Sequence, residues 1–356
     1  MADLALIAHR QAQKTAMATG IALIALVAIC FVTVHAGAIP IPPGTATHLI
    51  AQQLGLAPVD ENMQALRIIL IEIRLPRVVL GILTGAGLAV AGVTLQGLFR
   101  NPLADPGLVG VSTGAATAAA AFIVLGWPLI EYLSAPLLRQ ALLVAAFAGG
   151  LATTILIYAI ATREGRTDVA TLLLAGVAIN AMAAACIGLL IFLSSENELR
   201  DLNFWMLGSL NGVTWERLLV IGPVVLAAIL ALMRFGKHLN ALLLGESEAR
   251  HLGFDVERAK RWMITLVALT IGAIVAMTGA IGFVGLMVPH LTRLMMGADH
   301  RTLYPLSALL GACLVLLADL FARTIVVPAE LPIGIVTSFL GGPFFLWLLL
   351  RQKGAF

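Results

Sequence analysis

The chain has 356 residues, of which 60% are hydrophobic and only 12% are charged, and its mean hydropathy is +1.00. This composition excludes a water-soluble domain, and the continuous rather than alternating apolar runs argue against a porin-like β-barrel. The net charge of +3 gives no indication of a nucleic-acid partner. The sequence therefore predicts an all-α, polytopic membrane protein that forms a single transmembrane domain over residues 1–356.

Apolar segments recur along the chain, and most approach the roughly 20 helical residues that cross the hydrocarbon core of a bilayer. The 34 glycines suit close approach of helix backbones in lipid. Cys30, Cys186 and Cys313 each lie within an apolar run, which favours small core residues over disulfides or metal ligands. We expect about ten transmembrane helices, at residues 16–38, 74–98, 107–126, 140–161, 170–193, 216–235, 262–281, 284–297, 303–324 and 332–350.

The first of these segments could be a cleaved signal peptide or a transmembrane helix. Arg10 and Lys14 precede it, and residues 36–38 (Ala-Gly-Ala) resemble the small-residue site at which signal peptides are cleaved. The apolar run over residues 16–34 is longer than a usual signal core. We therefore favour an uncleaved first span.

The distribution of basic residues predicts the orientation, because cytoplasmic loops are enriched in Lys and Arg. With the N-terminus inside, seven of the 22 Lys and Arg residues lie outside and the remaining 15 lie on the cytoplasmic side. Both termini are therefore expected in the cytoplasm. The seven outside residues are Arg67, Arg74, Arg77, Arg139, Arg200, Arg217 and Arg323.

Two interruptions of the apolar pattern have a structure of their own. "NPLADPG" (Asn101–Gly107) breaks the chain between the second and third spans, because Asn-Pro and Asp-Pro dipeptides end helices and begin new ones. "SSENELRDLNFWMLGSLNG" (Ser194–Gly212) departs from a clean span. We expect a short extra helix near the outer face, within residues 194–215.

The stretch "LLLGESEARHLGFDVERAK" (Leu242–Lys260) is strongly charged in an otherwise apolar chain. Gly245 and Gly253 bracket a short helix with acidic residues early and basic residues late, which suits the helix dipole. Asp255 can cap a second short helix that carries Arg258. Two short helices joined at a glycine predict a compact cytoplasmic surface, which is either an ordinary charged loop or a docking site.

Asp319 is a carboxylate inside a predicted span, and such residues often mark proton relays. Arg323 follows it by four residues and therefore lies on the same face of a helix. A structural ion pair between the two is the favoured interpretation.

Several long motifs resemble the FecCD family of ABC-importer permeases, in the expected order over residues 65–352. The longest is "RLPRVVLGILTGAGLAVAGVTLQGLFRNPLADPGLVGVSTGA" (Arg74–Ala115). The others are "LLLAGVAIN" (Leu172–Asn180), "FWMLGSL" (Phe204–Leu210), "GFVGLMVPHLTR" (Gly282–Arg293) and "ELPIGIVTSFLGGPFFLWLL" (Glu330–Leu349). The resemblance implies a bacterial inner-membrane permease that imports an iron-siderophore, haem or cobalamin.

The resemblance also implies the assembly. It predicts a homodimer with the pathway on its two-fold axis, two ATP-binding cassette ATPase subunits on the cytoplasmic side and a periplasmic substrate-binding protein outside. The substrate is expected to be a small-molecule iron chelate, with haem favoured over a ferric siderophore or cobalamin. No resident cofactor or metal is implied.

Four groups of site residues follow from the resemblance. Arg74, Arg77 and Arg323 are expected to receive carboxylates of the binding protein, although arginines that anchor the helices at the membrane interface remain an alternative. ATPase coupling is expected at residues 242–260, through Gly245, Glu246, Glu248, Arg250, Gly253, Asp255 and Arg258. The cytoplasmic gate is expected at Asn101, Leu103, Val169 and Ala170, and the pathway lining at Phe204, Trp205, Met206 and Ser209.

The energy source is expected to lie in a partner. The sequence has no G-x-x-x-x-G-K-[ST] phosphate-binding loop; the nearest fragment, Gly236-Lys237-His238, lacks the first glycine and the hydroxyl residue. The chain is therefore predicted to be a non-catalytic subunit. The alternative from another class is a proton-coupled secondary transporter, for which Asp319 is the clear mid-span candidate.

Overall fold

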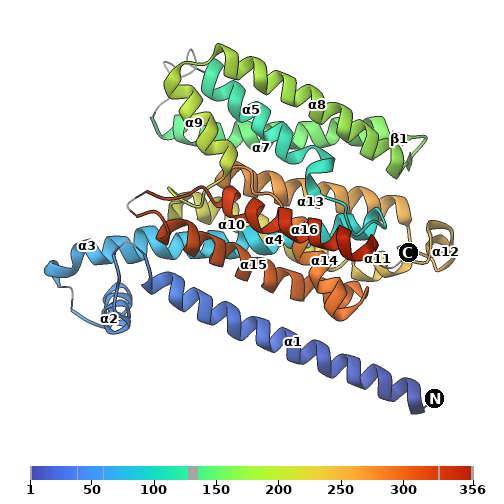
Figure 1. Cartoon of the computed structure of the whole chain (residues 1–356), viewed down its shortest axis with the longest axis horizontal. Helices are drawn as coiled ribbons and strands as arrows, with labels where there is room; N and C mark the ends of the chain where they lie inside the picture. The colour runs from blue at the N-terminus through green and yellow to red at the C-terminus, as the bar shows by residue number, and fades with distance from the viewer. Residues whose placement is uncertain (1, 38, 59, 127–134, 328, 354–356) are drawn as a thin grey trace.

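The structure, a computed structural model, describes residues 2–37, 39–58, 60–126, 135–327 and 329–353, and these are almost entirely helical (Figure 1). The N-terminal half contains α1 (Ala2–His35), α2 (Pro43–Gln53), η1 (Glu61–Met63), α3 (Gln64–Arg67), the π-helical η2 (Ile68–Arg74), α4 (Leu75–Leu98), η3 (Pro106–Val109), α5 (Val111–Leu125), α7 (Ala135–Ala161), β1 (Thr162–Arg163) and β2 (Arg166–Thr167). The C-terminal half contains α8 (Val169–Leu193), α9 (Glu196–Leu207), α10 (Trp215–Met233), α11 (Gly236–Leu242), α12 (Glu246–His251), α13 (Val256–Thr278), α14 (Val284–Met296), α15 (His300–Thr324) and α16 (Ile333–Lys353).

The predicted polytopic helical fold is confirmed. Within the described residues, seven helical stretches are long and apolar enough to cross a membrane, and Val111–Leu125 and Ile333–Leu348 are shorter apolar stretches. The expected span at 284–297 corresponds to α14, which has only 13 residues. Every predicted span thus has a helix in the structure. The seven long stretches are His9–His35, Gln64–Leu98, Gln140–Ala161, Val169–Leu193, Trp215–Met233, Val256–Thr278 and His300–Thr324.

The helices α4 and α13 form the centre of the protein, and α1 and α8 lie at its periphery (Figure 1). In the most apolar part of the stretch Gln64–Leu98, which contains α4, 78% of the residues are buried. In the most apolar part of α1 only 11% are buried. Small residues allow the central packing: a Cβ on Gly85 of α4 would overlap the carbonyl oxygen of Gly311 of α15. Leu88, Val267 and Leu316 are among the buried hydrophobic residues of these helices.

The two ends of the helical body carry different structures. Figure 1 shows the first residues of α1, the end of α16, α12 and the β1–β2 hairpin together at one end, while α2, α3 and α9 lie at the opposite end. The grouping agrees with the predicted topology, in which the termini and residues 242–260 share a side. The short helix expected within residues 194–215 is α9, which begins with a capping box formed by Ser195 and Glu198.

One element within residues 242–260 differs from the prediction. Asp255 caps a helix, accepting a hydrogen bond from the Arg258 N–H at 3.0 Å, but that helix is the 23-residue α13. The expected second short helix is therefore wrong, because no Gly or Pro interrupts Val256–Ile264 and its apolar face continues into the core. Residues 242–260 therefore contain one short helix, α12, and the short α11 ends at Leu242.

Candidate functional site

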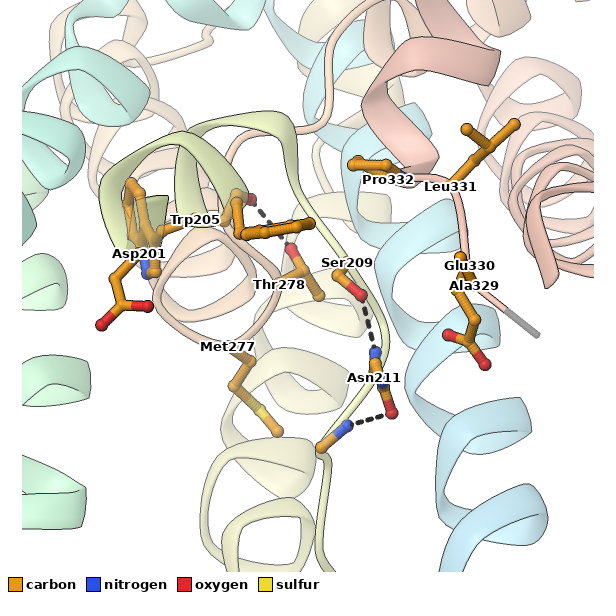
Figure 2. Close-up of a pocket in the computed structure, with 13 residues that line it drawn as sticks. Asp201, Trp205, Ser209, Asn211, Met277, Thr278, Ala329, Glu330, Leu331 and Pro332 are labelled. Carbon is orange, nitrogen blue, oxygen red and sulfur yellow. Dashed lines mark hydrogen bonds between the residues drawn. The ribbon is translucent and has the colours of Figure 1, made fainter. Parts of the chain in front are cut away.

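A cavity of about 750 Å³ opens at the end of the protein that carries α9 (Figure 2). Four segments line it: α9, the linker that follows α9, the end of α13 and the residues before α16. Its size falls within the usual range of small-molecule sites. The lining residues are Asp201, Phe204, Trp205, Ser209, Asn211, Gly212, Met277, Thr278, Gly279, Ala329, Glu330, Leu331 and Pro332.

Backbone contacts fix the walls of this cavity. The Ser209 N–H donates to the Thr278 carbonyl at 2.7 Å, and the Ile333 N–H donates to the Gly208 carbonyl at 3.0 Å. Gly279 has a φ of 69°, and a Cβ at this position would overlap the carbonyl oxygen of Trp205. The glycine therefore lets the end of α13 lie directly against the end of α9.

The predicted pathway residues are divided between two cavities. Phe204, Trp205 and Ser209 line the large one, as Figure 2 shows for Trp205 and Ser209. Met206 lines another cavity, of about 610 Å³, together with Ser338 and Phe339 of α16. The structure thus brings three of the four together, and their role in the pathway stays a prediction.

Arg77 connects the large cavity to a buried ion network. Its guanidinium donates to both carboxylate oxygens of Glu330, at 3.1 and 3.0 Å, and Glu330 lines the cavity. The same guanidinium binds Asp319 of α15 at 3.0 Å through Nε and 2.8 Å through Nη2. The expected pair of Asp319 with Arg323 is also present, at 3.6 Å. Sequence reasoning predicted this local pair and missed Arg77 as the principal partner.

Arg74 and Arg323 donate hydrogen bonds to main-chain carbonyls, and of the two only Arg323 also pairs with a carboxylate, that of Asp319. Arg74 donates to the carbonyl of Val34 at 2.7 Å and to that of Ile39, and Arg323 donates to the carbonyl of Thr33. All three predicted docking arginines are buried, with exposed fractions of 6% for Arg74 and 7% each for Arg77 and Arg323. The carbonyls of residues 33–35 and 39 hold the guanidinium groups of Arg74 and Arg323, so a partner's carboxylate can reach these two only if those residues move.

The predicted cytoplasmic gate residues lie in two capped turns. The Asn101 side chain accepts a hydrogen bond from the Leu103 N–H at 2.9 Å, and Leu103 is 39% exposed. Val169 and Ala170 begin α8, which Asp168 caps by accepting from the Thr171 N–H at 2.8 Å. Hydrogen bonds from the Thr171 side chain and backbone hold the pKa of Asp168 below its usual range.

Asn180 connects the two gate regions and was missed by sequence reasoning. Its amide nitrogen, in the middle of α8, donates to the Gly107 carbonyl at 3.1 Å, and its amide oxygen accepts from Thr113. An Asn inside an apolar span was the available signal, because a polar side chain in lipid needs a partner on another helix.

The predicted coupling segment has an exposed apolar component as well as charges. Gly245 and Gly253 have φ values of 119° and 85°, which form the turns on either side of α12. Glu248 and Arg258 are exposed, and Glu246, Arg250 and Glu257 form ion pairs. Leu244 and Leu252 are 65% and 60% exposed, so this segment presents leucines beside its charges. Exposed apolar groups ringed by polar ones are typical of protein-binding surfaces.

In the part of the chain that the structure describes, no group of three or more His, Cys, Asp or Glu residues could hold a metal ion. His290 packs edge-on against Phe344, with ring centroids 6.3 Å apart.

Comparison with known proteins relates the whole length of the chain to one family. The family model described as "FecCD transport family" matches residues 23–351. The chain is 48% identical to the hemin transport system permease protein HmuU of Yersinia pestis over 283 residues, which cover 80% of this chain and 83% of that protein. It is 42% identical to the cobalamin import system permease protein BtuC of Halobacterium salinarum over 322 residues, covering 90% of this chain and 82% of that protein.

A solved structure resembles the fold over nearly its full length. It shows an inward-facing conformation of an ABC transporter of the metal-chelate type, and it matches with a TM-score of 0.79 and 31% sequence identity. The match covers 94% of this chain and 98% of the other.

Proposed function

The chain belongs to the FecCD transport family and is an ABC-importer permease; on this premise we propose that it moves an iron chelate, haem, into the bacterial cytoplasm. The observation that carries the choice of haem is the similarity to the hemin permease over four-fifths of the chain. The cavity of about 750 Å³ beside α9 supports the proposal, because its aromatic and thioether side chains offer contacts to a large flat molecule.

The proposed assembly contains a homodimer of this chain in the inner membrane, two ATPase subunits and a periplasmic binding protein. The exposed Leu244 and Leu252 beside α12 support ATPase docking at residues 242–260. The absence of a phosphate-binding loop motif in the sequence supports a separate source of ATP hydrolysis. Transport follows alternating access, in which ATP-driven closure of the ATPases shifts the permease between its states.

Cobalamin is the second candidate substrate, and the similarity to a cobalamin permease over 90% of the chain favours it. A ferric siderophore remains a third candidate within the family. A proton-coupled secondary transporter is not favoured, because Asp319 is bound by both Arg77 and Arg323 and is 1% exposed.

Docking of the binding protein is proposed at the outer end, near Arg74, Arg77 and Arg323. Because residues 33–35 and 39 bind Arg74 and Arg323, the proposal includes displacement of these residues when the binding protein's carboxylates arrive. Arg77 already satisfies two carboxylates within the chain, so Arg74 and Arg323 are the better candidates of the three.

Uptake by the reconstituted complex tests the substrate. We expect proteoliposomes that contain this chain, its ATPase and its binding protein to accumulate haem when ATP is present on the cytoplasmic side. Excess cobalamin should not compete. Accumulation of cobalamin in place of haem would overturn the choice of substrate and retain the importer.

A further inference from the structure

Lys260 is a buried cation in a segment whose other charges face solvent. It lies in the second turn of α13, and its side chain is 2% exposed. A fully buried lysine is rare in proteins unless it is paired. Its position therefore requires partners, and those partners come from several elements.

The ammonium group of Lys260 binds acceptors from three segments. It lies 2.8 Å from Oε1 of Glu246 in α12 and 3.5 Å from Oε1 of Glu257 in α13. It also donates to the carbonyl oxygen of Thr167 in β2, at 3.0 Å. An ammonium has three donors, so these contacts match its full capacity. One side chain thus connects α12, α13 and the β1–β2 hairpin.

The hairpin is held from a second direction. The Thr167 N–H donates to Oε2 of Glu257 at 3.0 Å, and the Thr167 hydroxyl donates to Tyr158 at 3.2 Å. The turn of the hairpin, with Glu164 at a φ of 51° and Gly165 at 75°, is tight and short. Both the N–H and the carbonyl of Thr167 are therefore fixed by charged groups of α13.

Thr167 directly precedes the proposed gate. Asp168 follows it as the cap of α8, and Val169 and Ala170 are the first residues of that helix. A displacement of Thr167 therefore moves the start of α8 with it, because only the capping residue lies between them. The contacts of Lys260 run from the proposed ATPase-docking helix to the proposed gate.

Arg250 pairs with the same carboxylates as Lys260 but does not form an equally strong connection between the elements. It pairs with the same two carboxylates, at 3.5 Å to Glu246 and 3.1 Å to Glu257, but its side chain is 45% exposed. Solvent screens its interactions. The desolvated contacts of Lys260 are electrostatically stronger because the local dielectric constant is lower.

We propose that Lys260 is a positioning residue that transmits the movement of α12 to the gate segment Val169–Ala170, through Glu246 on one side and the Thr167 carbonyl on the other. The inference rests on the proposed function as an ATP-driven permease. It assigns a role in coupling to a residue that is buried beneath the docking surface and cannot itself contact the ATPase.

The test compares transport with ATP consumption in the same proteoliposomes, which contain the full importer. We expect Lys260→Met to lower the number of haem molecules imported per ATP hydrolysed about tenfold, within the usual range of allosteric coupling. The rate of ATP hydrolysis should persist, because the docking surface is intact. Lys260→Arg, which keeps the charge and the donors, should recover most of the ratio. Lys237→Met, the same change at an exposed lysine outside residues 242–260, should leave the ratio at the wild-type value.

A second variant tests the same connection in case Lys260→Met lowers the amount of folded protein. Glu246→Ala removes only the α12 end of the connection at a side chain that is 32% exposed, and it should lower the same ratio. A wild-type ratio in both Lys260→Met and Glu246→Ala, in a complex whose wild-type form transports, overturns this inference alone. A wild-type complex that transports nothing with ATP overturns the proposed function and the inference with it.

Discussion

At the scale of single residues, the end of the protein that carries α9 pairs the buried Arg77 and Arg323 with carboxylates of the same chain. Asp319 and Glu330 together offset Arg77 and Arg323, and Arg77 is shared between both carboxylates. Glu330 is the more exposed of the two acids, with a side chain 36% accessible beside the cavity, whereas that of Asp319 is 2% accessible. The two acids therefore differ in what their removal should cost.

Asp319→Asn is expected to destabilise the protein without blocking transport specifically. The variant leaves a single carboxylate, that of Glu330, to offset the two buried arginines Arg77 and Arg323, and breaking a buried pair in this way typically costs about 3–5 kcal/mol. Denaturant titration of the purified chain in detergent measures the free energy of unfolding, and uptake normalised to folded protein measures function.

Glu330→Gln is the matched comparison, with an expected cost of about 1 kcal/mol or less because solvent screens this pair. Full stability of Asp319→Asn combined with complete loss of uptake would contradict a structural role. That result would indicate a proton-carrying carboxylate instead.

The sequence could predict only part of this network. Arg323 follows Asp319 by one helical turn, so their pairing is a local property. Arg77 is separated from Asp319 by 242 positions, and their contact depends on how α4 packs against α15. For the same reason Lys260, which is close to acidic neighbours in sequence, gave no sign that it is buried against Thr167, 93 positions away.

At the scale of elements, the coupling segment combines a rigid frame with exposed leucines. The turns at Gly245 and Gly253 place α12 between α11 and α13. Its position was predictable from charge and glycine spacing. The length of the following helix was not predictable, because an Asp at position 255 is compatible with the N-cap of a short helix and with that of the long α13.

Leu244→Ser combined with Leu252→Ser is expected to weaken association with the ATPase subunit by about tenfold or more, as the loss of central apolar contacts at an interface does. Both side chains are well exposed in the chain alone, so the free energy of unfolding should change by no more than about 0.5 kcal/mol. Binding of the purified ATPase to the permease in detergent, without the binding protein, measures the effect.

Leu54→Ser with Leu56→Ser is the control, since these leucines are 67% and 78% exposed after α2, at the opposite end of the protein. Equal ATPase binding by the Leu244/Leu252 variant and by the wild type would contradict the assignment of the docking surface to residues 242–260.

At the scale of the whole molecule, the order and approximate positions of the predicted spans followed from hydropathy, because each span must satisfy its backbone internally and be apolar outside. The short helices α2 and α11 did not follow from it. The relative positions of the helices did not. The contact of α4 with α15 depends on two glycines, Gly85 and Gly311, that no periodicity distinguishes from the other glycines of the chain. The cavity beside α9 likewise requires the ends of α9, α13 and α16 to meet, which only the folded structure shows.

The energy source distinguishes the two classes of transporter at this scale. If the chain works as an ATP-driven permease, uptake into vesicles should persist when an ionophore collapses the proton gradient, provided that ATP reaches the face that carries α12. The physical reason is that Asp319 pairs with Arg77 and Arg323 within the chain, so this carboxylate has a structural role and is not available to carry protons across the membrane.

The measurement is the initial rate of haem uptake in four conditions, with and without ATP and with and without ionophore. A non-hydrolysable ATP analogue serves as the control for nucleotide binding alone. Uptake that requires the gradient and ignores ATP would contradict the importer assignment, whereas uptake that requires ATP hydrolysis and is insensitive to the ionophore agrees with Asp319 as a structural charge.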